Sequence, residues 1–321
     1  YGGAKEKLLR AKSNSTTLGS ANKNCVNNTK YEYWLCEWLS KKKLAVKDST
    51  YIRYRNIVDN HVAPTLGKYA INKISTSLMN GFVKEKLQSG KLDKSGGISP
   101  KMMSDMIVII KETFKYANNN GVSTICDFSE ISIKRSSHGM RVLSNSEEKR
   151  LLSVLSCDTD CYKLGVFICL FTGIRIGELC ALQWKNISFA DGTLKVDQTM
   201  QRLQYEDKLS PQKTRIVITE PKSFAAIRTI PLPGFLIELM LPFAASPNAF
   251  VLSGECKEYV EPRTMQNRFK TYLSEGDISD AIFHSLRHTF ARRCVEIGFD
   301  IKTLSEILGH SSVKITLDKY V

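Results

Sequence analysis

The chain has 321 residues, 42% of them hydrophobic, a mean hydropathy of −0.20 and a formal net charge of +14 at pH 7. This length suits two domains with a large core, and no apolar run reaches the roughly 18 residues that a membrane helix needs. The composition therefore excludes a membrane-spanning protein and predicts a soluble globular one with a polyanionic partner.

The positive charge is concentrated in the N-terminal part of the chain. Residues 1–135 contain 23 Lys and Arg against 11 Asp and Glu, a net charge of +12. Residues 136–321 contain 23 against 21, a net charge of +2. A difference in net charge of this size indicates that the first part of the chain binds the phosphate backbone of DNA.

The cysteines and the N-terminus bear on the cellular compartment. The nine cysteines are odd in number and include no C-x-x-C pair, which is typical of reduced thiols in a cytosolic protein. The first residues lack the pattern of a secretory signal peptide. We therefore expect a cytoplasmic protein.

The N-terminal part predicts a flexible arm followed by a helical domain. Residues 1–27 are polar and without apolar periodicity, as in a linker or arm, and the start at Tyr1 without Met predicts a fragment. Residues 28–119 predict an α-helical DNA-binding domain with Trp34 and Trp38 in its core. We expect its four helices near 30–42, from 48 to about 61, from 75 or 76 onward and from about 100 to 118, with a break at Pro64 and Gly67.

Basic side chains in this region are the expected contacts to DNA phosphates. Those in the helical domain are Lys41, Lys42, Lys43, Lys47, Arg53 and Arg55. Lys134 and Arg135 belong to a polar interdomain linker, expected at residues 120–142, and would cross the DNA backbone if the two domains form a clamp.

Residues 143–321 predict a second domain. Ser144 and Glu147 have the spacing of a capping box before a helix to about residue 156. An apolar helix then ends at Thr172-Gly173, which places Arg175 at the start of the next helix, where free N–H groups favour an anion. Strands at 193–196, 200–203, 214–219 and 227–230 precede helices near 233–245 and 261–274. The fold class is thus mainly α with a small antiparallel β-sheet; residues 208–215 extend one hairpin, either as a DNA or protomer contact or as a plain loop.

The C-terminal stretch 284–320 gathers groups suited to an anion. His284 and Arg287 are three apart, so they share one face of a helix. His288 and His310 add imidazoles, and Tyr320 adds a phenol. Phosphate is the obvious anion for such a set.

A zinc site is the alternative for the two histidines at positions 284 and 288, which have the spacing of H-E-x-x-H. Ser285 stands where that motif has Glu, and no third ligand follows at a familiar spacing. We therefore expect no metal site.

Four motifs occur in one order along the chain: T-G-x-R-x-G-E-L at 172–179, H-x-L-R-H-T at 284–289, L-G-H at 308–310, and Tyr320. Together they closely resemble the tyrosine recombinase family, and within it the phage and conjugative-transposon integrases. The resemblance covers about residues 28–320. It implies a two-domain DNA clamp, with an α-helical core-binding domain and an α+β catalytic domain.

The resemblance also implies a role for each residue of the site. The two arginines neutralise phosphate charge, the histidines donate hydrogen bonds, the tyrosine is the nucleophile, and Lys222, matching the lysine of a family hairpin, is the general acid. Glu178 either orients the cationic groups or is a plain surface carboxylate, and His288 is expected to support the fold. The expected catalytic residues are Arg175, Lys222, His284, Arg287, His310 and Tyr320.

The implied reaction is site-specific DNA recombination for a mobile element, in integration or excision. A 3′-phosphotyrosyl intermediate forms without metal, ATP or other cofactor, and four protomers exchange strands of double-stranded DNA through a Holliday junction. An accessory DNA-bending or excision factor is a possible partner, and the location is a bacterial cytosol or nucleoid. Two alternatives stay open: a nicking-closing enzyme like type IB topoisomerases, and a DNA-binding protein without activity.

Overall fold

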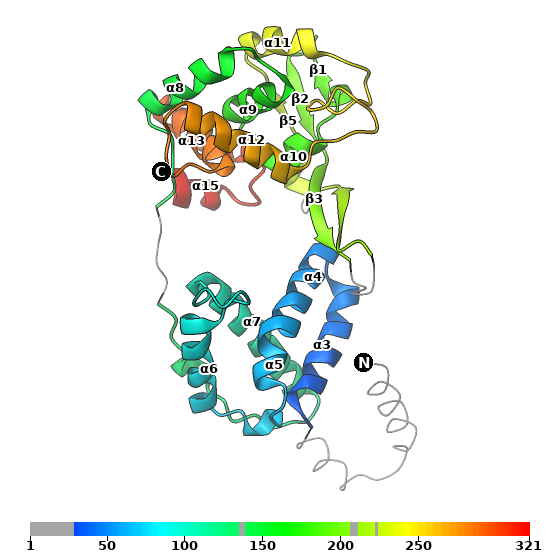
Figure 1. The fold of residues 1–321 in the computed structure, drawn as a ribbon, viewed down its shortest axis with the longest axis vertical. Coiled ribbons are helices and arrows are strands. Elements are labelled where there is room, and N and C mark those ends of the chain that lie inside the picture. Colours follow the sequence, from blue (N-terminus) through cyan, green and yellow to red (C-terminus); the bar gives the residue numbers. More distant parts are fainter. Residues whose placement is uncertain (1–28, 135–138, 206–210, 222–223) are drawn as a thin grey trace. The chain divides into compact units, whose positions relative to one another are not determined.

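The computed structural model divides the chain into two compact units, Tyr1–Ser137 and His138–Val321 (Figure 1). It describes residues 29–134, 139–205, 211–221 and 224–321. Helices predominate and the strands are few, which confirms the predicted fold class. None of the described helices is long and apolar enough to cross a membrane.

The first unit consists of helices, as its sequence predicts. Two of them begin at serine caps: the Ser75 and Ser99 hydroxyls accept the N–H groups of residues 78 and 102, each at 3.2 Å. The helices are α3 (Tyr31–Ala45), α4 (Asp48–Ile57), the π-helix η1 (Val58–Val62), α5 (Ala63–Leu66), the 3-10 helix η2 (Ile71–Lys73), α6 (Thr76–Ser89), α7 (Pro100–Asn119) and the 3-10 helix η3 (Phe128–Glu130).

The expected break at Pro64 is wrong. The helix widens into one π-helical stretch, where the Ala63 N–H bonds to the Val58 carbonyl, and then continues to Leu66. Proline lacks an N–H and its ring clashes with the carbonyl four residues back in an α-helix. A wider turn accommodates both features, so the helix continues past the proline and ends before Gly67, where the second expected break lies.

The mainly aliphatic core of the first unit includes a group of aromatic side chains. Trp34 and Trp38 are buried, as predicted, and Tyr31 meets Phe114 edge-on with ring centroids 5.3 Å apart. Phe128, from the segment expected to be a linker, packs edge-on against Phe114 at 5.1 Å. Residues 120–133 therefore pack on this unit.

The second unit contains most of the helices and all of the named strands in the described residues. Ser144 and Glu147 form the predicted capping box. Its helices are α8 (Asn145–Ser156), α9 (Cys161–Thr172), α10 (Ile176–Ala181), α11 (Gly234–Met240), α12 (Pro262–Glu275), α13 (Phe283–Glu296), α14 (Ile301–Leu308) and α15 (Val313–Tyr320), with 3-10 turns η4 (Trp184–Asn186), η5 (Phe224–Ala226) and η6 (Leu241–Phe243).

The strands form two antiparallel sheets. One has the order β1-β2-β5, and the other is the hairpin β3-β4, which lies between β2 and β5 in the sequence. The register pairs Val196 with Arg228 in the first sheet and Met200 with Ile218 in the second. The strands are β1 (Ile187–Ser188), β2 (Thr193–Val196), β3 (Thr199–Gln204), β4 (Thr214–Thr219) and β5 (Arg228–Pro231).

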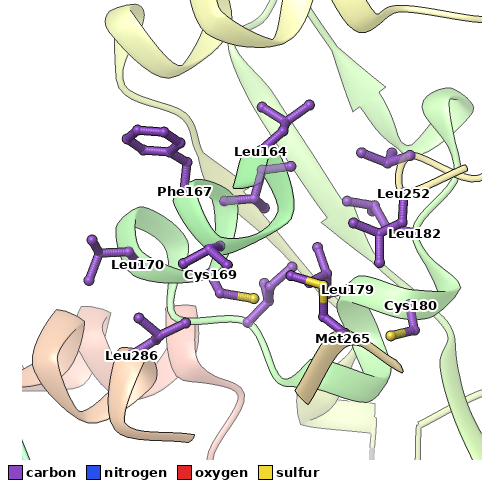
Figure 2. Close-up of a cluster of buried hydrophobic side chains, with 14 of the residues drawn as sticks. Leu164, Phe167, Cys169, Leu170, Leu179, Cys180, Leu182, Leu252, Met265 and Leu286 are labelled. Atoms are coloured by element: carbon purple, nitrogen blue, oxygen red, sulfur yellow. The ribbon is translucent and has the colours of Figure 1, made fainter. Parts of the chain in front are cut away.

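Helix α9 is the centre of the second unit. Its side chains from Leu164 to Leu170 are buried, and Leu179 and Leu286 bring α10 and α13 into the same cluster (Figure 2). Neighbouring atoms come so close that a Cβ on Gly165 would lie 2.5 Å from Leu252 Cδ2. This packing fixes the helices that flank the Thr172-Gly173 turn.

Gly173 ends α9 in the left-handed region, with φ of 66°, and a Cβ there would lie 2.5 Å from Phe290 Cδ1. We expect Gly173→Ala to lower the free energy of unfolding by about 2–3 kcal/mol, because strained backbone and overpacking add. Urea unfolding of the whole chain measures the change. Gly234→Ala is the matched control, since no heavy atom lies within 4 Å of its Cβ position; an equal loss in both variants would contradict the explanation.

Candidate active site

Three arginines of the second unit meet at the C-terminal end of α14. The last carbonyls of a helix have no partner within it and carry a partial negative charge, so cationic donors are favoured there. Three consecutive carbonyls each accept from a different arginine: Ile307 from Arg228 Nε at 2.5 Å, Leu308 from Arg287 Nη2 at 2.6 Å, and Gly309 from Arg175 Nη2 at 3.3 Å.

The three arginines come from different parts of the fold. Arg175 is the N-cap of α10, immediately after the Gly173 turn, as the sequence predicts. Arg228 is the first residue of β5, and Arg287 lies in α13. Arg287 is 2% exposed and Arg228 9%, whereas the side chain of Arg175 is 38% exposed. Arg175 is therefore the one of the three with the most access to a ligand.

Glu178 balances two of these arginines. Its buried carboxylate accepts from Arg228 Nη2 at 2.8 Å and from Arg175 Nη1 at 2.8 Å, and it also accepts the Arg175 backbone N–H at 2.9 Å. Burial favours a raised pKa for Glu178, but the hydrogen bond and charge of Arg228 and the charge of Arg175 outweigh it and lower the pKa. Glu178 is thus an ionised, buried carboxylate and not a surface one.

Arg287 donates to carbonyls, the Gly173 oxygen at 2.8 Å and the Leu308 oxygen. Burial, followed by repulsion from Arg175, lowers the pKa of Arg287 to about 9. A guanidinium whose charge is disfavoured in this way is stabilised by an anion placed beside it. The site therefore has positive charge in excess of its carboxylate.

Tyr320 lies buried among histidines at the end of α15. Its hydroxyl is 2.8 Å from His288 Nδ1, and its ring stacks with that of His310 at 6.5 Å between centroids. His284 meets His288 edge-on at 4.6 Å, and His310 Nδ1 lies 2.8 Å from the Thr316 hydroxyl. The four side chains thus form one connected group.

Burial and the surrounding positive charge keep these imidazoles neutral at pH 7. The pKa is lowered to about 4 for His284 and His288 and to about 3 for His310, in each case by burial first. Burial also raises the pKa of Tyr320, while Arg287 and Arg175 oppose that rise. The phenol is therefore protonated in the free protein and needs an acceptor to react.

A cavity of about 320 Å³ adjoins the site. His284 and Arg287 line one part of it, and Arg263, Gln266 and Lys270 of α12 line another. Ile282, Phe283 and other apolar side chains complete the wall. Positive charge and hydrogen-bond donors suit it to an anionic chain.

The structure brings together every predicted catalytic residue that it describes; Lys222 lies outside the described residues. Glu178 contacts the arginines, and His288 contacts the Tyr320 hydroxyl instead of only packing in the fold. In the described part of the chain, no three His, Cys, Asp or Glu side chains are grouped so that they could hold a metal ion.

The predicted DNA contacts lie in the first unit, apart from the catalytic residues in sequence. Lys42 Nζ lies 3.5 Å from Glu112, and Arg53 forms an ion pair with Asp105. Lys41, Lys43 and Lys134 are exposed, and Lys41 and Lys43 lie over the rings of Tyr116 and Tyr51. Lys47 and Arg55 also have partners. Arg135 lies outside the described residues.

Arg228 was missed as a site residue by sequence reasoning, although a signal was present. Arg228 and Ile230 are two residues apart in β5, so their side chains lie on the same face of the strand, and that face is buried. A charged residue at an inward strand position indicates a buried ion pair, since an unpaired charge there is very costly. The partner, Glu178, could not be named because it is 50 residues away.

Comparison with known proteins assigns the family. The phage integrase family model matches residues 141–321, more than half of the chain, and the model of the N-terminal SAM-like domain of phage integrases matches residues 30–87. The chain belongs to the phage integrase family. The expected family is thereby confirmed.

Relatives within this integrase family match over most of the chain. The tyrosine recombinase XerC-like protein of Caldanaerobacter subterraneus subsp. tengcongensis is 25% identical over 313 residues, covering 89% of this chain and 76% of the relative. The ICEBs1 integrase of Bacillus subtilis is 22% identical over 302 residues, covering 88% and 76%.

Solved integrase structures share the fold. The Tn1549 transposon integrase in complex with a circular intermediate DNA has a TM-score of 0.73 at 19% identity, covering 91% of this chain and 95% of that one. A lambda integrase tetramer bound to a Holliday junction has a TM-score of 0.67 at 17% identity, covering 96% and 86%.

The buried ion pair between Glu178 and Arg228 should contribute more than other contacts to the stability of the integrase site. We expect Glu178→Gln to lower the free energy of unfolding by about 3–5 kcal/mol, because Arg228 is left as an uncompensated buried charge. Thermal unfolding measures this, with Glu306→Gln on exposed α14 surface as the matched control.

The difference in the free energy of unfolding between the wild type and Glu178→Gln should depend on pH. Because the folded pKa of Glu178 is depressed, its contribution is complete above the unfolded pKa near 4.3 and is lost as the pH falls through the folded value. The gap between the wild type and Glu178→Gln should therefore narrow on acidification below about pH 4. A gap that widens there would contradict an ionised Glu178.

Proposed function

We propose that this chain is a site-specific recombinase that cleaves and rejoins DNA through a 3′-phosphotyrosyl bond to Tyr320. The observation that carries the proposal is the placement of a buried tyrosine hydroxyl in a group with excess positive charge, next to a cavity lined by cations. Membership in the phage integrase family, with relatives named recombinases and integrases, supports the class of reaction.

Attack on a phosphodiester builds negative charge on the non-bridging oxygens. Fixed cationic and hydrogen-bond donors stabilise that charge in proportion to their preorganisation. We assign this role to Arg175 and Arg287, whose guanidinium groups are held by helix and turn carbonyls. His284 and His310 act as further donors, which their neutral state allows through one ring N–H each.

The chemical step exchanges one ester bond to phosphorus for another. The Tyr320 oxygen forms a bond to phosphorus, the bond from phosphorus to the 5′-oxygen breaks, and Lys222 protonates the departing oxygen. A 5′-hydroxyl of a partner duplex then attacks the phosphotyrosine and releases Tyr320. No net bond energy is lost, so the exchange runs without ATP.

We propose that the first unit binds the DNA backbone on the other side of the duplex, as one half of a clamp. We propose a core-binding domain at 28–119, a linker at 120–142, of which residues 120–133 pack on the first unit, and a catalytic domain at 143–321. Phosphates compete with Glu112 for Lys42 and with Asp105 for Arg53, so these two residues bind DNA at the cost of an ion pair. The remaining contacts are Lys41, Lys43, Lys47, Arg55, Lys134 and Arg135.

The proposed partners are two duplexes and further copies of this chain. The lambda integrase structure with similar fold is a tetramer on a Holliday junction. We propose the same assembly here, with an accessory DNA-bending or excision factor and a cytoplasmic location. Exchange of strands between two labelled duplexes distinguishes this function from the nicking and closing of one duplex.

Tyr320→Phe removes one oxygen and keeps the ring, so DNA affinity should stay within about a factor of ten, or roughly 1.4 kcal/mol. Covalent attachment to DNA should vanish, because the phenol is the nucleophile. Denaturing electrophoresis with DNA nicked near the cleavage point traps the adduct. An adduct formed by Tyr320→Phe would assign the nucleophile to another residue, and no adduct from the wild type on cognate ends would leave a DNA-binding protein.

Lys222→Ala should slow cleavage of normal DNA by about 10²–10⁴-fold, the usual contribution of a general acid. A substrate with sulfur in place of the 5′-bridging oxygen has a leaving group that needs no proton, so its cleavage should be restored. Single-turnover rates on the two substrates give the comparison. Equal slowing on both would make Lys222 a groove contact instead of the acid.

A further inference from the structure

We propose that His288 is the base that accepts the proton of Tyr320 during cleavage and returns it during rejoining. This inference rests on the proposed function and adds a catalytic residue to it. It differs from the sequence-based expectation, in which His288 supports the fold.

The geometry distinguishes His288 from the other imidazoles. His288 Nδ1 lies 2.8 Å from the Tyr320 hydroxyl, within the range for transfer of a proton, and both side chains are buried. The ring of His284 instead meets the ring of His288 edge-on. His310 stacks parallel to the Tyr320 ring and directs its Nδ1 to the Thr316 hydroxyl. Among the described residues, His288 is the imidazole that is hydrogen-bonded to the nucleophilic oxygen.

The charge state of His288 suits an acceptor. Burial first, and then Lys319 and Arg287, lower its pKa to about 4, so the ring is neutral at pH 7 and Nδ1 can hold the lone pair that faces Tyr320. The groups that face it are His284 and Arg287 on its own helix, and Lys319 and Tyr320 on α15.

A bound phosphodiester changes the balance around this base. Its negative charge lies near the same cations that disfavour the imidazolium, and partly cancels them, which raises the basicity of His288 at the moment of reaction. The neighbouring positive charge also favours the phenolate character that Tyr320 gains as its proton leaves. Substrate binding thus prepares both partners of the transfer.

The proton balance closes over a full cycle. During cleavage the Tyr320 O–H bond breaks, Nδ1 of His288 takes the proton, and the phenolic oxygen bonds to phosphorus as the 5′-oxygen leaves with a proton from the acid. During rejoining, the attacking 5′-hydroxyl gives its proton back to that acid. The imidazolium of His288 then protonates Tyr320 as the phosphotyrosine bond breaks.

Arg287 and His288 are adjacent in α13, so one helix supplies both the phosphate-binding group and the base. Arg287 is anchored by the Gly173 and Leu308 carbonyls, which fixes the rotation of α13 about its axis. His288 follows it and is turned by about 100° around the helix, toward α15 and Tyr320. The same anchor therefore places the phosphate-binding group and the base.

The test compares His288→Ala with His288→Asn in single-turnover cleavage of nicked DNA. The asparagine amide oxygen can take the place of Nδ1 as a hydrogen-bond acceptor, but it takes no proton at neutral pH. We expect both variants to cleave about 10²–10⁴-fold more slowly than the wild type and to bind DNA with unchanged affinity. Glu296→Gln, exposed at the end of the same helix, is the matched control. Cleavage by His288→Asn within about threefold of the wild-type rate would overturn the proposal, since the hydrogen bond alone would then suffice.

A second measurement distinguishes His288 as a base from His288 as a residue that only positions the Tyr320 ring. 3,5-Difluorotyrosine at position 320 has a more acidic phenol, which loses its proton without help. The defect of His288→Asn should shrink at least about tenfold with this nucleophile, and its rate on normal tyrosine should rise with pH. An unchanged defect and a flat pH profile would overturn the role of His288. Absence of an adduct in the wild type would instead overturn the proposed recombinase function.

Discussion

The interaction on which the site depends is the binding of three arginines to the C-terminal carbonyls of one short helix, α14. A helix of eight residues leaves half of its carbonyls without an intrahelical partner. Here the carbonyls of Ile307 and Leu308, and that of the C-cap Gly309, receive guanidinium groups from β5, α13 and the N-cap of α10. These contacts tie four elements that are far apart in sequence. They also fix the Leu308-Gly309-His310 turn, and through it the start of α15 and the position of Tyr320.

One carboxylate makes this concentration of positive charge tolerable. Glu178 is placed between Arg228 and Arg175, whereas Arg287 has carbonyl partners only partly able to compensate its charge. The positive charge of these arginines therefore exceeds the negative charge of the one carboxylate, and an anion beside Arg287 would be stabilised. In the proposed reaction, a phosphodiester supplies that anion, and its transition state, which carries more negative charge, interacts with the arginines more strongly. Stability and catalysis therefore draw on the same electrostatic imbalance.

The position of Arg175 is also linked to the β3-β4 hairpin. Gly177, in the helix that Arg175 caps, lies so close to β3 that a Cβ would come within 2.7 Å of the Met200 carbonyl. Arg202 of β3 is in turn bound by Glu261, the residue before α12, whose side chains line the cavity beside the site. The hairpin is thus a structural support of the active site as well as an extension of the domain.

The sequence by itself determined the helix and strand types, the capping box of Ser144 and Glu147, the family and the residue types of the candidate site. It did so because periodicity, capping and short motifs are local, and because Arg175, Arg287 and Tyr320 lie within such motifs. It failed at Pro64, where a π-helical turn replaces a break, and at Arg228, whose partner is distant in sequence. The contact of His288 with Tyr320 could not be predicted either, since 32 residues, including the whole of α14, separate them. Only the tertiary structure decided these points, because the rotation of α13 and the packing of α15 depend on long-range contacts that no local pattern encodes.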